Sequence, residues 1–427
     1  DGIRVSGASR GRGDVYKRQI VSDLNPPPRL LMGPGPINCD PRVLHAMTMP
    51  HLGHTDPAFF YYMDEAMELL RRVFETENHW SFLVNGTARS GIEALMISMI
   101  SPGDRVLVPI FGRFGHLLTE ISDRCGEETR TIETNWGQVF DLNQIEDAIK
   151  KHKPKLVALV HGDTSTTTAQ PLEEIGKICR DHDSLLFVDA TATLGGMPFK
   201  TNEWQIDAAA AGLQKCLAGP PGTALITFND RTADIVNKRR HIESGIAPFD
   251  FAAPNTPKIQ SNYLDNPMLM EWWSDKRLPH HTEATPMLFA ARECARIILQ
   301  EGMETAYARH QIASDALVAG LKAMGLEVFG ELKHKMPNVT GVVIPPNVDG
   351  DAVRRDLLSC FGIEIGTSFG ELRGKIWRIG TMGYNCRKQN VLICLTALET
   401  CLSRCEFHTP LGEAAKAALN VYDGRDD

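Results

Sequence analysis

The sequence lacks the features that mark several large classes of protein. No apolar run approaches the roughly 18 residues of a membrane-spanning helix, and residues 1–19 lack the apolar core of a secretory signal. The ten cysteines include no CxxC pair, which in a chain of this size indicates reduced, mostly buried thiols in a cytosolic protein. There is neither a Walker loop nor a GxGxxG fingerprint, so nucleotide binding has little support. We therefore expect a cytoplasmic protein with no membrane partner.

The chain also has fewer basic than acidic residues. The formal net charge is −8 and the isoelectric point is about 6.0, which argues against nucleic acid as a partner. The hydrophobic share of 43% and the charged share of 23% are ordinary for a globular protein. The 427 residues are enough for two domains, because a domain typically has about 100–200 residues.

Short apolar runs alternate with helical patterns through the first two thirds of the chain. Strands are expected at 81–84, 105–109, 156–160, 185–189 and 223–228, and this alternation is typical of a doubly wound α/β fold with a mostly parallel sheet. A long helical pattern from 286 to about 324 then connects to a smaller α+β region. The expected organisation is a disordered or artefactual tail (1–19), an N-terminal arm (20–45), a large domain (46–285) and a connecting helix with a small C-terminal domain (286–427).

Two of these segments carry opposite charges at their ends. The apolar run 185–189 ends in Asp189, and the small-residue run 206–213 leads to Lys215. Ligands of open α/β sheets bind at the carboxyl ends of the strands, so both side chains are expected in one crevice. An amine and a carboxylate placed in this way suit pyridoxal phosphate, because the lysine forms a Schiff base and the aspartate pairs with the pyridine nitrogen. The alternative is a solvated Lys215 and an Asp189 that caps a helix.

Other segments have weaker signals. The turn 85–91 between a strand and a helix predicts an anion site at the helix N-terminus, although Ser90 with Glu93 also fits a structural capping box. An aromatic residue at Phe114 suits stacking on a flat ring or plain core packing. His51 and His54 share a loop without further metal ligands, so no metal site is expected. Arg378, between apolar neighbours in a strand, is either a carboxylate clamp or a surface salt-bridge partner.

Taken together, several motifs resemble those of class V aminotransferases, in the alanine/serine–glyoxylate aminotransferase group and most of all the bacterial (S)-ureidoglycine–glyoxylate type. The resemblance covers about residues 31–402. It includes Gly33-Pro34-Gly35-Pro36, Asn85-Gly86-Thr87-Ala88-Arg89, Val188-Asp189-Ala190, Gln214-Lys215-Cys216-Leu217, His280-His281-Thr282-Glu283-Ala284-Thr285 and Trp377-Arg378-Ile379-Gly380-Thr381-Met382-Gly383. It implies the fold-type-I architecture of pyridoxal-phosphate transferases, with a large domain whose sheet is sandwiched by helices and a smaller C-terminal domain.

The resemblance also implies roles for individual residues. Lys215 is similar to the Schiff-base lysine and Asp189 to the pyridinium partner. Arg378 is similar to the carboxylate clamp, Gly35 lies in a substrate-contacting turn, and Thr282 matches a phosphate ligand from the neighbouring subunit, which implies a homodimer with shared sites. Further cofactor contacts are expected at Thr87, Ala88, Arg89, Phe114, Thr164 and Gln214. Relatives often have glycine where this chain has Ala88, so only backbone donation is expected there.

The activity implied is a ping-pong transfer of an amino group from (S)-ureidoglycine to glyoxylate in purine catabolism, with Lys215 as general acid and base. Asn262 and His54 are the candidate contacts to the ureido group, although either also fits an ordinary loop residue. Alanine or serine as donor is the alternative. A cysteine desulfurase of the same fold is less favoured, because that group generally has histidine where this chain has Gln214. A non-enzymatic ligand-binding protein would leave Lys215 without a purpose.

Overall fold

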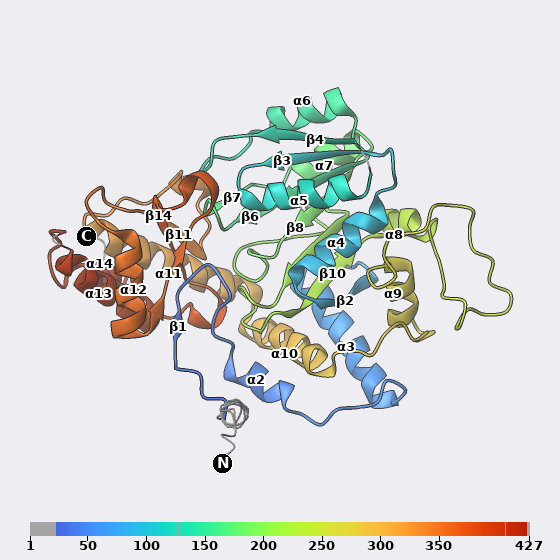
Figure 1. The fold of residues 1–427 in the computed structure, drawn as a ribbon, viewed down its shortest axis with the longest axis horizontal. Helices are drawn as coiled ribbons and strands as arrows, with labels where there is room; N and C mark the ends of the chain where they lie inside the picture. The colour runs from blue at the N-terminus through green and yellow to red at the C-terminus, as the bar shows by residue number, and fades with distance from the viewer. Residues whose placement is uncertain (1–22, 127, 406, 425–427) are drawn as a thin grey trace, which may run out of the picture.

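The computed structural model of the protein describes residues 23–126, 128–405 and 407–424. The predicted tail at 1–19 and the first residues of the predicted arm lie outside these ranges. The described chain has the predicted α/β class, with one large mostly parallel sheet and a smaller region at one end (Figure 1). None of the described helices is long and apolar enough to cross a bilayer.

Seven strands form the central sheet. They are β2 (Trp80–Gly86), β3 (Arg105–Ile110), β4 (Glu128–Glu133), β5 (Leu156–Val160), β8 (Leu185–Asp189), β9 (Ala208–Gly212) and β10 (Gly222–Phe228). Their order is β2-β10-β9-β8-β5-β3-β4, and only β10 runs antiparallel to its neighbours. Every residue of β5, β8 and β9 is buried, as expected for parallel strands covered on both faces.

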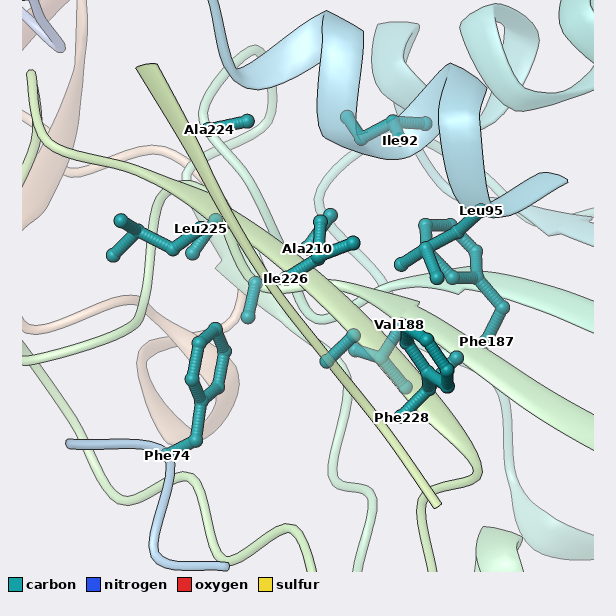
Figure 2. Close-up of a cluster of buried hydrophobic side chains, with 14 of the residues drawn as sticks. Phe74, Ile92, Leu95, Phe187, Val188, Ala210, Ala224, Leu225, Ile226 and Phe228 are labelled. Carbon is teal, nitrogen blue, oxygen red and sulfur yellow. The ribbon is translucent and has the colours of Figure 1, made fainter. Parts of the chain in front are cut away.

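Helices cover both faces of this sheet. They are α2 (Pro41–Met47), α3 (Pro57–Val73), α4 (Ala88–Met99), α5 (Arg113–Arg124), α6 (Leu142–His152), α7 (Ile175–Asp181), α8 (Asp230–Asn237), α9 (Asn266–Trp273) and α10 (Thr285–Glu301). Ile92 and Leu95 of α4 lie on one side of the strands, and Phe74 lies on the other (Figure 2). Close packing requires a glycine in α4, because a Cβ on Gly91 would lie 2.7 Å from the Cβ of Ala224.

Several elements of this sheet region are absent from the predicted pattern, among them β4, α6 and two short strands. The edge strand β4 is mostly exposed and polar, so it lacks the apolar run by which the other strands are found. Helix α6 was not predicted either, although its N-terminus carries a capping box. In this box Asp141 accepts from the Gln144 N–H, and the Gln144 side chain accepts from the Asp141 N–H. A small hairpin, β6 (Gly162–Asp163) with β7 (Thr168–Ala169), also lies where the sequence predicts a loop.

The smaller region has its own hydrophobic core. Its elements are α11 (Met303–Ala323), β11 (Val339–Val343), α12 (Gly350–Phe361), β12 (Ile363–Glu364), β13 (Gly366–Thr367), β14 (Ile376–Gly380), α13 (Lys388–Arg404) and α14 (Glu413–Tyr422), with 3-10 turns at Leu332–His334, Gly370–Leu372 and Gly383–Asn385. Strands β11, β14 and β13 form one antiparallel sheet. This gives the α+β character that the sequence predicts.

The connection between the two regions differs from the prediction. The single long helix expected from 286 to about 324 is wrong, because Gly302 separates α10 from α11 with a φ of 91°. A glycine adopts such a positive φ without the steric penalty of other residues. The buried residues of α10 join the core of the large sheet, whereas those of α11 from Ala313 onward join the smaller core. The domain boundary at 285/286 stays a prediction.

The N-terminal arm lies between the two regions. Its strand β1 (Leu30–Leu31) pairs in parallel with β12. The Gly380 N–H donates to the Met32 carbonyl at 2.7 Å. The arm then turns at residues 33–36 toward Lys215, whose Nζ donates to the Pro34 carbonyl. Both regions therefore hold the arm in place over the lysine.

Candidate active site

Asp189 and Lys215 come from neighbouring parallel strands. Asp189 is the last residue of β8 and pairs in register with Ala210 of β9, and Lys215 follows the end of β9 by three residues. The turn after the lysine contains Ala218 with a φ of 61°, and the Ala218 N–H donates to the Lys215 carbonyl. Both functional side chains line one cavity of about 190 Å³. They lie on the same side of the sheet, as the strand pattern predicts.

The same cavity gathers the other predicted cofactor contacts, apart from Thr282. Its lining consists of Thr87, Ala88, Arg89, Ile92, Phe114, Leu117, Gly162, Thr164, Asp189, Thr191, Ala192, Gln214 and Lys215. These residues come from the ends of several strands and from the starts of α4 and α5. A second cavity of about 220 Å³ lies beside the Cys216–Ala218 turn, but none of the predicted site residues lines it.

The first turn of α4 is open to the cavity. Thr87 is the N-cap residue and makes no side-chain capping bond, so the first N–H groups of α4 are not satisfied by a cap. The capping box expected from Ser90 and Glu93 is wrong, because Ser90 lies inside the helix and its N–H and Oγ both donate to the Thr87 carbonyl. Uncapped N–H groups and the positive end of the helix dipole attract an anion such as a phosphate.

Burial shifts the pKa values of the amine and the carboxylate toward their neutral forms. The pKa of Lys215 falls to about 8, first because of burial and then because the Arg378 cation lies nearby. Burial raises the pKa of Asp189, although the Thr191 N–H donates to its Oδ1 at 2.9 Å and counters that rise. A cation placed against Asp189 would favour its ionised form. At neutral pH more of Lys215 is therefore the free amine, which is the nucleophilic form, than at the ordinary pKa of a lysine.

Buried polar atoms in the cavity also indicate a ligand. Gln214 Oε1 and Thr191 Oγ1 are buried and have no hydrogen-bond partner among the described residues. Both residues line the cavity. Because an unsatisfied buried polar atom costs about 1–3 kcal/mol, these atoms fit a cavity that holds a polar ligand. The N–H groups at the start of α4 match the phosphate of pyridoxal phosphate. The Asp189 carboxylate matches its ring nitrogen, and the Lys215 amine matches its aldehyde.

Asp163 is a residue of the site that the sequence reasoning missed. Its carboxylate is fully buried and accepts from the Phe114 N–H at 2.7 Å and from the N–H and Oγ of Ser165. It thereby holds the start of α5 and so places the Phe114 ring at the cavity. A Cβ on Gly112 would lie 2.4 Å from the Asp163 carboxyl carbon, so this contact needs glycine. Its signal in the sequence is the polar loop after β5, where predicted Thr164 stands next to it.

Arg378 lies in β14 and is only 4% exposed, so a surface salt bridge is not its role. Its Nε donates to the Thr367 carbonyl and its Nη1 to the Thr164 carbonyl, both at 2.7 Å, and Nη2 also donates to Thr367. One N–H on each terminal nitrogen remains for a ligand, which suits a carboxylate. Burial lowers the pKa of Arg378 to about 10, so it stays charged at neutral pH.

Gly35 lies directly over the lysine. Its φ is 100°, and a Cβ there would come within 2.6 Å of Lys215 Nζ. Only glycine fits this place without displacing the amine. The predicted turn at residues 33–36 therefore forms one wall around the lysine.

Three predicted residues are not brought to this cavity by the single chain. Asn262 and Thr282 belong to a group that we call the loop cluster, formed by Asn262, His280, His281 and Thr282. The Asn262 carbonyl contacts His280 Nε2 at 3.1 Å, and His281 Nε2 contacts Asn85 Nδ2 at 2.7 Å. His54 is exposed and packs its ring edge-on against Phe59. None of the three lines the Lys215 cavity.

A cysteine desulfurase also uses a catalytic cysteine, and the exposed Cys360 does not bring a thiol to this cavity. It is exposed near the end of α12 and contacts Arg404, and it is not among the lining residues. Within the described ranges, no group of three or more histidine, cysteine, aspartate or glutamate residues is placed to hold a metal ion.

Comparison with known proteins identifies the family. The profile of the class V aminotransferases matches residues 48–371. The chain belongs to this family. Its fold is the fold-type-I architecture, and pyridoxal phosphate is the cofactor of such enzymes. The chain is 53% identical over 404 residues to the (S)-ureidoglycine–glyoxylate transaminase of Bacillus subtilis, and the match covers 94% of this chain and 97% of that protein.

Two further comparisons bear on the aminotransferase. The crystal structure of the ureidoglycine–glyoxylate aminotransferase from Bacillus subtilis superposes with a TM-score of 0.89 at 51% identity, over 94% of this chain and all of that one. The alanine–glyoxylate aminotransferase of Callithrix jacchus is 33% identical over 392 residues, with 91% of both chains covered. The identity to the (S)-ureidoglycine–glyoxylate transaminase of Bacillus subtilis is higher than this by 20 percentage points.

Proposed function

We propose that this aminotransferase moves the amino group of (S)-ureidoglycine to glyoxylate, which gives glycine and an oxo acid. The observation that carries the reaction class is the convergence of Lys215 and Asp189 on one cavity, together with the buried Arg378, which donates to the carbonyl of the cavity residue Thr164. The 53% identity to a relative that uses this donor and acceptor supports the choice of substrates over the alanine type.

The residues present fit pyridoxal phosphate. The start of α4, with Thr87, Ala88 and Arg89, would hold the phosphate through backbone donors. Asp189 would face the ring nitrogen, Lys215 the aldehyde carbon, and Phe114 one ring face. The cofactor, when bound, supplies an electron sink for the bond that breaks at the substrate α-carbon.

Residues of the chain itself bind the substrate, orient it and move the proton. Lys215 Nζ, with a pKa near 8, takes the proton from the donor α-carbon and later returns a proton to the acceptor. Arg378 binds the carboxylate shared by donor and acceptor through its two remaining N–H groups, and so orients the α-carbon toward Lys215. Gly35 and Pro34 form a wall that limits water at the amine.

The donor contacts and the assembly belong to the same proposal. We assign Asn262 and His54 to the ureido group and Thr282 to the cofactor phosphate of a second copy. The chain would act as a cytoplasmic homodimer, with each loop cluster completing the cavity of the other copy. The separation of these residues from the Lys215 cavity of their own chain supports a shared site.

The experiment that tests the donor compares three amino donors with glyoxylate as the common acceptor. We expect kcat/KM for ureidoglycine to exceed that for alanine and for serine, because only ureidoglycine offers a polar ureido group. Glycine formation, measured by chromatography, gives all three rates on one scale. If alanine or serine is used much faster than ureidoglycine, the assigned donor is wrong. Asn262→Ala should weaken the use of ureidoglycine more than that of glyoxylate.

A further inference from the structure

Arg113 is a cation in an electrostatically unfavourable place. It is the first residue of α5, where the helix dipole disfavours positive charge, and no acidic residue lies in the first turn. Its backbone N–H donates to Ser165 Oγ at 2.9 Å. Within the described ranges, none of the ion pairs includes its guanidinium, and its side-chain contacts are with aromatic rings.

The guanidinium lies near a ring that lines the cofactor cavity and near the carboxylate clamp. It is 5.2 Å from the centre of the Phe114 ring, which lines the cavity, and 4.4 Å from the centre of the Phe369 ring. Arg378 lies 4.9 Å from the centre of the same Phe369 ring. Two arginines from different regions of the chain therefore share one aromatic residue at the edge of the site.

This arrangement leaves hydrogen-bond donors free. A guanidinium that stacks on rings uses its flat face, whereas its N–H groups project along its edge. Besides burial, the positive charge of Arg113 lowers the pKa of Arg378, whereas the Asp163 carboxylate raises it and so offsets part of the repulsion between the two cations. An oxygen acceptor between them relieves that repulsion, so the pair favours a substrate with a second acceptor group beyond its α-carboxylate.

We propose that Arg113 is a specificity-determining residue, whose N–H edge binds an oxygen acceptor on the side group of the amino donor while Arg378 holds the α-carboxylate. In (S)-ureidoglycine that acceptor is the ureido carbonyl oxygen. The inference depends on the proposed function only for the identity of this group, because a carboxamide or carboxylate side group presents the same kind of oxygen. Donors without such an oxygen, such as alanine, gain nothing from Arg113.

The test measures donor preference in three variants. Arg113→Met keeps much of the apolar stem and removes the charge, and Arg113→Lys keeps the charge and removes the planar edge. Arg124→Met is the matched control, because Arg124 ends the same helix and is exposed in an ion pair with Glu120. Each variant is assayed with ureidoglycine, asparagine, aspartate and alanine, and the visible absorbance of the bound cofactor reports on the integrity of the site.

We expect Arg113→Met to lower kcat/KM for ureidoglycine about tenfold more than for alanine, which is the size of one charge-assisted hydrogen bond. The preference of Arg113→Lys for ureidoglycine over alanine should lie between those of the wild type and Arg113→Met. The preference of Arg124→Met should match that of the wild type. Equal losses for all donors, or no loss, would overturn the proposal.

Failure of the proposed function gives a different result. If the wild type rejects ureidoglycine but uses asparagine or aspartate, the assigned donor is wrong, and a selective loss of these two donors in Arg113→Met still supports the role of Arg113. A wild type that uses alanine and none of the oxygen-bearing donors overturns the inference itself.

Discussion

The Lys215 cavity and the loop cluster are built in two different ways. The cavity is formed where strands β8 and β9 and helices α4 and α5 end or begin, so a single folded chain assembles it. The loop cluster lies in the irregular segments before and after α9. His280 contacts both Asn262 and His281, and none of the four residues lines the cavity. One chain thus brings Lys215 and Asp189 together, whereas the roles proposed for Asn262 and Thr282 require a second copy. Four experiments test this contrast.

The largest effect is expected from Lys215→Ala. We expect transaminase activity to fall by at least about 10³-fold. Among the described residues, no other amine lines the cavity and could carry the proton. The visible absorbance of the lysine-bound cofactor should disappear as well. Lys177→Ala, on the exposed side of α7, is the control and should leave both readouts unchanged. Activity that survives in Lys215→Ala would remove the lysine from the mechanism.

Arg378→Gln should raise KM for glyoxylate by about 30- to 100-fold, because a buried bidentate contact to a carboxylate is lost. The fall in kcat should be smaller. Arg378 also donates to two backbone carbonyls. The thermal unfolding midpoint of the variant must therefore be measured beside the kinetics. Arg354→Gln is the matched control, because Arg354 is a neighbouring cation that donates to the Ile365 carbonyl and to Asp351 rather than to the carbonyl of a cavity residue. An unchanged KM would reject the clamp.

The loop cluster is tested by mixing two inactive enzymes. Lys215→Ala carries an intact loop cluster, and Asn262→Ala/Thr282→Val carries an intact lysine. If the sites are shared, a mixed dimer contains one site with both intact parts. Random mixing of subunits should then restore about a quarter of the wild-type activity. If each chain completes its own site, no activity returns, and the assignment of Asn262 and Thr282 to a partner is wrong.

The smallest effect is a shift in pH dependence. Only the unprotonated amine attacks an aldehyde, and the pKa of Lys215 is lowered from 10.5 to about 8. The rate at which the apoenzyme takes up cofactor, followed by absorbance, should therefore rise with pH with a midpoint near 8. Arg378→Gln removes a neighbouring cation and should move the midpoint upward. A wild-type midpoint near 10 would show that the amine is not perturbed.

Much of the cavity could be predicted from the sequence because strand ends are visible in it. The apolar run before Asp189 and the small-residue run before Lys215 mark buried parallel strands, and the carboxyl ends of such strands meet at one edge. The family motifs added Thr164, Gln214 and Gly35, each of which lies at or beside the lysine. Local pattern and topology agree in this part of the chain.

The rest depended on contacts that no local pattern encodes. Asp163 becomes important only because the fold brings the Phe114 N–H to it from 49 positions away. Strand β4 was missed because an exposed edge carries no apolar run. The capping box at Ser90 failed because the helix begins before it, at Ala88, and the split between α10 and α11 rests on one glycine.

The arm over Lys215 has a consequence for how the protein is made. Strand β1 near the start of the chain pairs with β12, more than 330 residues later. The segment that covers the amine therefore finds its partner strand only after more than 330 further residues have been synthesised. Chains that already contain Asp189 and Lys215 would lack the cover over the amine until β12 has been made, so synthesis of β12 sets the moment at which the arm can close over Lys215.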